Sequence, residues 1–126
     1  MRDDSGADSL KIVSRGCAEH YTWGDTLREP CDGWHLVRAP ELSVIEECMP
    51  PGTSEVRHYH VRARQFFYVL SGELTIEVEG QDFVLRGGEG VEVAPGQRHQ
   101  VMNRGEAGAR MLVVSQPRSH GDRVVE

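Results

Sequence analysis

Three histidines and one glutamine have the spacing of a metal site. His58 and His60 stand two residues apart in a stretch that reads as extended, so both imidazoles point to the same face of a strand. Gln65 follows after four residues, enough for a turn into the next strand, and can offer an amide oxygen to the same point. His99 comes much later in the chain. We interpret these four residues as the ligands of one divalent ion inside a small β-barrel.

This set of ligands favours Lewis-acid chemistry. Three neutral imidazoles and a neutral amide leave the full +2 charge on a divalent ion, whereas a glutamate would neutralise part of it. Imidazole suits Zn, Ni, Fe or Cu, and the oxygen ligand does not exclude Mn. The sequence therefore predicts one ion per chain and leaves the metal open among these five. It also leaves open whether Gln65 binds the ion directly or supports the residues that do.

Short strands separated by Gly and Pro must position these residues. The stretch 73–79 alternates apolar and charged residues and is the clearest half-buried strand, and residues 42–49, 65–70 and 110–115 are also strand-like. No stretch has a helical period. The pattern predicts an all-β fold with a single barrel and one domain over residues 1–126. Within it we expect an N-terminal arm with short strands (1–35), a barrel core (42–115) and a polar tail (116–126).

With these residues in view, the chain resembles the cupin superfamily. Five residues have the spacing of the first cupin motif: Gly52, His58, His60, Gln65 and Gly72. Gln65 stands where the motif has a glutamate. The second motif is matched over a later set: Gly88, Gly96, His99 and Asn103. The resemblance covers about residues 42–115 and implies a monocupin, a single jelly-roll-type barrel with one metal. Small cupins with glutamine at this position include uronate-converting enzymes and a polyketide cyclase.

The resemblance implies an enzyme but does not identify the reaction. Our leading hypothesis is an isomerase, cyclase or lyase that uses a divalent metal as a Lewis acid on a carbonyl-bearing, anionic small molecule. One alternative is an iron-dependent dioxygenase. Another is a non-catalytic module that binds a sugar or another small molecule. O₂ uptake and metal content would separate these hypotheses.

Glu47 is the candidate catalytic residue. It lies on the strand that enters the first motif, in phase with Ile45 and Met49, so we expect it to face inward, and an inward carboxylate near a metal is a natural general base. The alternative is an exposed edge charge or a hydrogen-bonded core acid. His120 and Asp122 could fold over the barrel mouth, but we expect a solvated tail.

Charge and composition restrict the partners. The formal net charge of −6 argues against nucleic acid and gives no support to binding of anionic membranes. No apolar run approaches the ~20 residues of a membrane helix, and three cysteines without close spacing indicate reduced thiols. We therefore expect a cytoplasmic protein that acts on a small molecule. Edge strands and an aromatic N-terminal arm favour a homodimer. Four arginines flank the ligands and could attract an anion: Arg57, Arg62, Arg64 and Arg98.

Overall fold

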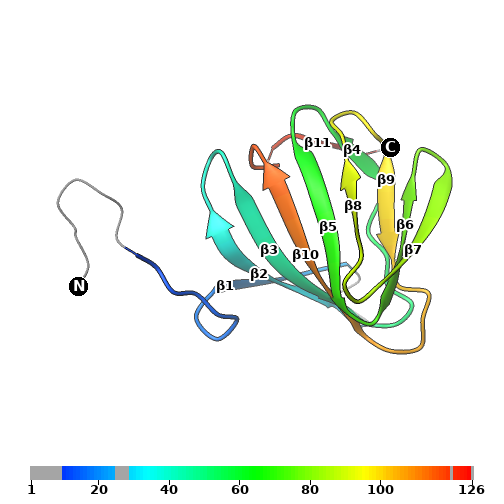
Figure 1. The fold of residues 1–126 in the computed structure, drawn as a ribbon, viewed down its shortest axis with the longest axis horizontal. Helices are drawn as coiled ribbons and strands as arrows, with labels where there is room; N and C mark the ends of the chain where they lie inside the picture. The colour runs from blue at the N-terminus through cyan, green and yellow to red at the C-terminus, as the bar shows by residue number, and fades with distance from the viewer. Residues whose placement is uncertain (1–9, 25–28, 120, 126) are drawn as a thin grey trace.

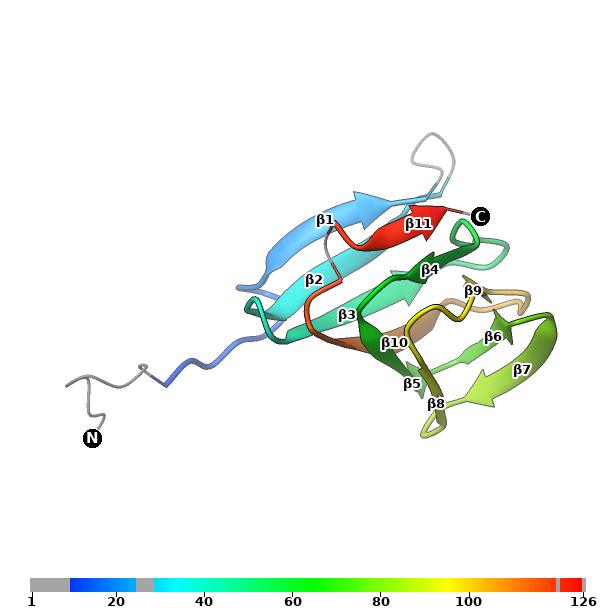
Figure 2. The same cartoon turned by 90° about the horizontal axis from the view of Figure 1, so that it is seen from above.

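Two antiparallel sheets build the molecule. The computed structural model describes residues 10–24, 29–119 and 121–125, and all regular elements among them are strands (Figures 1 and 2). One sheet has the order β1-β2-β3-β10-β5-β8 and the other β11-β4-β9-β6-β7. The predicted all-β cupin barrel is thus confirmed as a two-sheet jelly roll. The described residues include no helix that could span a membrane.

The strand bounds follow. The six-stranded sheet contains β1 (Glu19–Trp23), β2 (Cys31–Arg38), β3 (Ser43–Met49), β10 (Ala109–Gln116), β5 (Arg64–Ser71) and β8 (Gly90–Val93). The five-stranded sheet contains β11 (Arg123–Val125), β4 (His58–His60), β9 (His99–Met102), β6 (Glu73–Val78) and β7 (Gln81–Arg86).

Alternation of side chains along the strands places the core between the sheets. Along β5, Gln65, Phe67 and Val69 point inward and are 6%, 4% and 1% exposed. Leu74 and Ile76 of β6 are also buried, as their alternation predicted. The core they join is apolar and includes residues from both sheets: Cys31, Met49, Phe67, Val69, Leu74, Ile76, Val93, Val101, Ala109, Met111 and Val113.

Two residues of the recognised motifs serve the backbone and not the chemistry. Gly72 has a φ of 82°, and a Cβ there would lie 2.8 Å from the carbonyl oxygen of Gly108, so only glycine fits this turn. Asn103 is 1% exposed. Its Nδ2 donates to the carbonyl oxygens of Met49 and Ala107 at 2.8 and 3.0 Å. Asn103 therefore ties the end of β9 to β3.

The two ends of the chain differ from the prediction. Within the predicted N-terminal arm, residues 10–14 have no regular structure, and β1 pairs with β2. The tail is not simply solvated, because β11 pairs with β4 and Asp122 is 6% exposed. β1 pairs with the next strand along the chain, β2, whereas β11 pairs with a strand from the middle of the chain, and local periodicity does not report such a distant pairing. Residues 1–9 and His120 lie outside the described residues.

Candidate metal centre

Strand pairing brings the three histidines together. β4 and β9 are neighbours, and His58 lies directly opposite His99. The centroid of the His58 ring lies 4.9 Å from that of His60 and 4.4 Å from that of His99. One ligand atom from each of the three residues lies within 4.8 Å of the others. The convergence predicted from the sequence is thus present, and the group could hold a metal ion.

Backbone carbonyls fix the orientation of two of the rings. His58 Nδ1 donates to the carbonyl oxygen of Val56 at 2.7 Å, and His99 Nδ1 donates to that of Gln97 at 2.9 Å. A carbonyl only accepts, so each Nδ1 carries the proton and each Nε2 keeps its lone pair. His99 Nε2 and His60 Nδ1 are buried and have no hydrogen-bond partner among the described residues. Buried polar atoms of this kind are normally satisfied, and a cation would satisfy a lone pair at His99.

Gln65 also has a buried oxygen that lacks a hydrogen-bond partner among the described residues. Its side chain is 6% exposed, and Nε2 donates to Ser115 Oγ at 3.0 Å. Its Oε1 is buried without a partner among the described residues. Because Ser115 Oγ accepts from the amide nitrogen of Gln65, the amide oxygen is left to contact another group. The side chain therefore fits the predicted ligand, and its coordination of the ion stays a prediction.

Burial keeps the imidazoles neutral. It lowers the pKa of His58 to about 3 and that of His60 to about 4, and it lowers the pKa of His99 as well. The proximity of the rings lowers the first two further, because two imidazolium charges repel. A metal ligand must be unprotonated. The residues present therefore fit a divalent ion at neutral pH.

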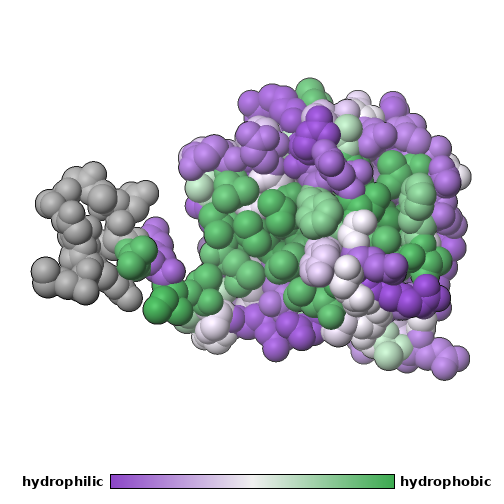
Figure 3. All heavy atoms as spheres, viewed as in Figure 1, coloured by the Kyte–Doolittle hydropathy of each residue, from purple (hydrophilic) through white to green (hydrophobic). Residues whose placement is uncertain are grey.

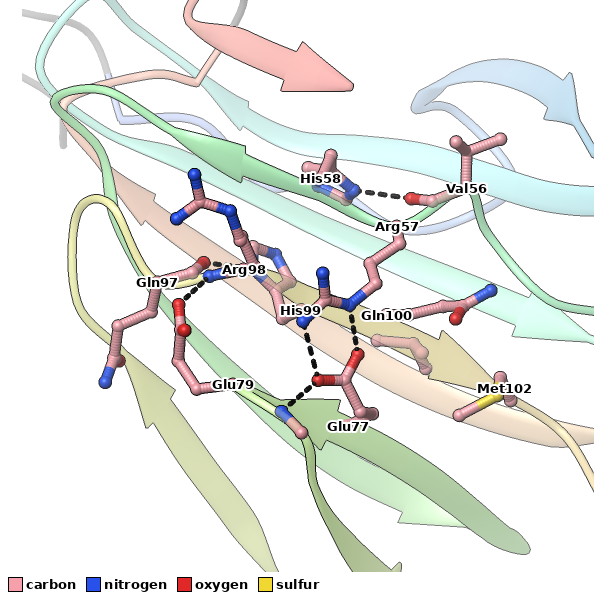
Figure 4. A network of polar contacts seen from close by, with 12 residues as sticks. Val56, Arg57, His58, Glu77, Glu79, Gln97, Arg98, His99, Gln100 and Met102 are labelled. Carbon is pink, nitrogen blue, oxygen red and sulfur yellow. Dashed lines mark hydrogen bonds and ion pairs between the residues drawn. The ribbon is translucent and has the colours of Figure 1, made fainter. Parts of the chain in front are cut away.

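A network on the outer side of the five-stranded sheet supports the ligand strands (Figure 4). Arg57 Nε and Nη2 donate to Glu77 Oε1 and Oε2 at 2.7 and 3.1 Å. The peptide N–H of Arg98 donates to Glu79 Oε1 at 2.6 Å. These contacts join the segments before His58 and His99 to β6. Arg57 thus serves the scaffold.

A cavity of about 530 Å³ opens beside the ligands, and Glu47 lies in its wall. The Tyr21 hydroxyl donates to Glu47 Oε2 at 2.6 Å. Burial raises the pKa of Glu47 to about 7, although the bond from Tyr21 acts in the opposite direction. Burial and the Glu47 carboxylate also raise the pKa of Tyr21, so the hydroxyl remains a donor. The prediction that Glu47 faces inward is confirmed, and its catalytic role stays a prediction.

Glu46 faces the opposite side of the same sheet. It is 7% exposed, and Arg110 donates to its Oε2 from Nε and Nη2 at 3.0 and 2.8 Å. This ion pair, in which two guanidinium nitrogens share one carboxylate oxygen, neutralises the charge of Glu46 away from the cavity. The alternation of β3 thus separates two adjacent glutamates into a structural residue and a cavity residue.

Two charged residues of the cavity were not among the predicted site residues. Glu55 accepts a hydrogen bond from the peptide N–H of Val101 at 3.0 Å. Burial and the neighbouring charge of Glu47 raise the pKa of Glu55 to about 8. Arg123, on β11, also lines the cavity. Glu55 lies in an irregular segment and Arg123 in the tail, so no local pattern marks either residue.

The four arginines proposed to attract an anion do not line this cavity. Arg64 Nη1 donates to Glu92 at 2.6 Å, and the Arg98 guanidinium lies 4.8 Å from the centroid of the Tyr59 ring. Arg123 is the only arginine among the described lining residues. The arginine beside this cavity thus comes from the tail and was not among the four predicted.

Family comparison agrees with the geometry. The Cupin_2 family, described as a cupin domain, matches residues 45–115, which include all four predicted ligands. The chain belongs to the cupin family. Its membership accounts for the jelly roll and for the two spaced motifs, and it leaves the reaction open because one fold hosts many chemistries.

Relatives include proteins of polyketide biosynthesis. This cupin is 35% identical over 69 residues to the tetracenomycin polyketide synthase protein TcmJ of Streptomyces glaucescens. The match covers 55% of this chain and 46% of TcmJ, so the chain spans less than half of that relative. Among solved structures, the polyketide cyclase RemF of Streptomyces resistomycificus is 22% identical, with a TM-score of 0.73 and coverage of 93% of this chain and 86% of RemF.

Another solved structure shows the same fold under a different description. A predicted oxalate decarboxylase of Thermotoga maritima has a TM-score of 0.76 and 19% identity, and the match covers 86% of this chain and all of that one. At these identities the likeness to RemF and to the Thermotoga protein shows the fold alone.

Proposed function

We propose that this cupin is a metal-dependent enzyme that enolises a carbonyl-bearing small molecule, in a reaction of the isomerase, cyclase or lyase type. The observation that carries the proposal is the meeting of a neutral ligand set with a proton-accepting carboxyl in one cavity. His58, His60, His99 and Gln65 would hold the ion. When bound, the ion would supply a Lewis acid that stabilises negative charge on a substrate oxygen.

Glu47 would move the proton. A base for enolisation must be unprotonated for part of the time at the working pH, and a pKa near 7 meets this condition. Tyr21 holds one oxygen of the carboxyl, Oε2, and the structure gives Oε1 no hydrogen bond with another described residue. Glu47 Oε1 is thus the atom that would take a proton from carbon and return it at another position of the product.

Cyclisation of a polyketide-like substrate is the version that the relatives support best. TcmJ is described as a polyketide synthase protein and RemF as a polyketide cyclase. The cavity wall also contains Tyr21 and Trp23, which offer flat apolar surface to a ring or a planar chain of carbonyl groups. Arg123 would favour a substrate with an anionic group. Ring closure would then follow proton removal from a carbon between two carbonyls.

The test is exchange of carbon-bound protons with solvent. We would remove metal from the purified protein with a chelator, restore Zn, Ni, Mn, Fe or Cu singly, and follow deuterium incorporation into a panel of β-dicarbonyl compounds and unsaturated uronates by NMR. We expect exchange only with metal and a loss of at least tenfold in Glu47→Gln, since a positioned base contributes about 10²–10⁴-fold.

Three results would contradict the proposal. Metal-dependent O₂ uptake with the iron form would favour the dioxygenase. Tight binding of a sugar without exchange would favour a binding module. Exchange that is equal in wild type and Glu47→Gln would leave the Lewis acid in place and remove Glu47 as the base.

A further inference from the structure

The turn between two of the predicted ligands is built around a carboxylate from the other end of the chain. His60 ends β4 and Gln65 lies at the start of β5, so residues 61–63 set the relative direction of the two side chains. Asp122, next to β11, is 6% exposed and lies at this turn. The distance in sequence between the turn and its partner is about half of the chain.

Every peptide N–H of the turn donates to Asp122. Val61 N lies 2.9 Å from Oδ1, Arg62 N lies 3.0 Å from both Oδ1 and Oδ2, and Ala63 N lies 2.8 Å from Oδ2. Val61 N also donates to the carbonyl oxygen of Asp122 at 3.1 Å. Successive N–H groups that converge in this way form an anion-binding concavity. The pKa of Asp122 lies below its usual value because these three bonds outweigh the raising effect of burial.

The surrounding strands hold the same assembly from both sides. β11 pairs along all of β4, with Arg123 opposite His60 and Val125 opposite His58. On the other side, the N–H of Gly96 donates to the carbonyl oxygen of His60 at 2.8 Å. His60 is therefore fixed by its backbone, since its Nδ1 has no partner among the described residues. His58 and His99 differ, because a carbonyl holds each ring directly.

We propose that Asp122 is a positioning residue for the metal site, which sets the directions of His60 and Gln65 by gathering the N–H groups of residues 61–63. The inference rests on the metal centre of the proposed function. It gives the C-terminal segment a definite role, because the segment holds the backbone of His60, the ligand whose Nδ1 has no partner among the described residues. Ligand orientation set by outer contacts commonly decides metal affinity.

The experiment compares Asp122→Asn and Asp122→Ala in the full chain. Asparagine keeps the shape and one oxygen acceptor but turns an NH₂ toward donors, whereas alanine removes both acceptors. We expect the Kd for Zn²⁺ to rise about 10- to 100-fold in Asp122→Ala, the range for loss of an outer-shell partner, and by less in Asp122→Asn. The visible absorption of bound Co²⁺, which reports ligand number and geometry, should also change.

Asp82→Asn is the matched control. Asp82 is an exposed acid whose Oδ2 accepts from Arg104 Nη1 at 3.1 Å, and it lies on β7, at the opposite edge of the five-stranded sheet from β11. The Asp82→Asn substitution removes one negative charge, as Asp122→Asn does, and should leave the Zn²⁺ affinity and the Co²⁺ spectrum unchanged. The thermal transition of each metal-free variant shows whether it is folded.

The outcomes separate a positioning role from a merely structural one. A folded Asp122→Ala protein with wild-type Zn²⁺ affinity and a wild-type Co²⁺ spectrum would overturn the inference, even if its melting temperature fell. If the alanine variant does not fold, the same two measurements on Asp122→Asn decide. Failure of the unaltered chain to bind Zn²⁺ or Co²⁺ would instead refute the metal centre itself, and the inference with it.

Discussion

The two faces of the six-stranded sheet each depart, in one region, from the usual distribution of polarity. An antiparallel sheet normally turns apolar residues to the core and polar ones to water. Here the inner face carries the buried polar residues Gln65 and Ser115 at one end. The outer face carries Val44, Val114 and Phe66 side by side on β3, β10 and β5. At both places, stability of the single chain does not account for the type of residue that is present.

Binding of a metal ion would explain the buried polar residues of the inner face. Buried polar side chains cost free energy unless they are hydrogen-bonded, and the Gln65 Oε1 and His99 Nε2 atoms have no partner among the described residues. Gln65 lines a cavity whose wall also contains Glu47. The core below them is apolar and closely packed, with Val69 and Ile76 both 1% exposed. The same two sheets thus provide an apolar core and, at one end, a cluster of buried polar side chains.

The apolar residues on the outer face of the six-stranded sheet fit association with a second copy of the chain. Apolar side chains gather over the face of this sheet in Figure 3, and Phe66 is 41% exposed. The charged residues at this face are paired within the chain, Glu46 with Arg110 and Arg64 with Glu92. A net charge of −6 opposes self-association, but a face whose charges are internally paired reduces that repulsion. The predicted homodimer stays a prediction, and this face is where we would test it.

The largest expected effect comes from removing the inner ligands. In His58→Ala/His60→Ala, two of the three imidazoles are lost, and metal content should fall from one ion per chain to near zero by elemental analysis. His20→Ala is the control, because His20 is an exposed residue that pairs with Asp32 at 2.8 Å. Undiminished metal in the double variant would show that these histidines are only buried.

Charging the outer face should change mass and leave metal content alone. We expect Leu112→Glu, next to Tyr68 in the strand register, to convert a dimer into a monomer by light scattering, because burial of an unpaired carboxylate is unfavourable. Val84→Glu, at a valine of β7 that is 48% exposed, should have no such effect. A wild-type chain that is already monomeric would refute the dimer.

Stability should respond to pH through Glu47. Its pKa in the folded state, about 7, is above the ordinary value of 4.5, so the folded protein binds this proton more tightly than the unfolded chain does. The resulting stabilisation is complete below about pH 4.5 and is lost as the pH rises through 7. The free energy of unfolding of Glu47→Gln should therefore rise relative to that of the wild type between pH 5 and 8, by about 2–3 kcal/mol. A constant difference between the two proteins across this range would contradict the raised pKa.

The sequence predicted the inner face better than the chain ends. Strand alternation suffices for His58 and His60, because positions two apart on one strand share a face, and motif spacing adds Gln65. Glu55, Asp122 and Arg123 were not predicted to belong to the site, because their positions depend on pairing between distant segments. A carboxylate that binds three peptide N–H groups has no signature in its own sequence neighbourhood. Such residues become visible only when the tertiary contacts are known.

The smallest and most specific effect concerns Gln65, the residue that separates this chain from the common cupin motif. If its Oε1 binds the ion, Gln65→Glu places an anionic oxygen in nearly the same position. Metal should then bind at least as tightly, because a carboxylate attracts a cation more strongly than an amide does.

Lewis acidity should fall in the same variant, since the added negative charge neutralises part of the ion's charge. We expect retained metal together with a several-fold slower deuterium exchange, measured on one preparation by elemental analysis and NMR. Gln65→Ala should weaken binding only modestly, because the three histidines remain. Loss of the metal from Gln65→Glu would place the side chain outside the coordination sphere, where a buried carboxylate beside Ser115 would disturb the site instead. Full metal with full exchange would show that the neutral ligand set is not what makes the ion a strong Lewis acid.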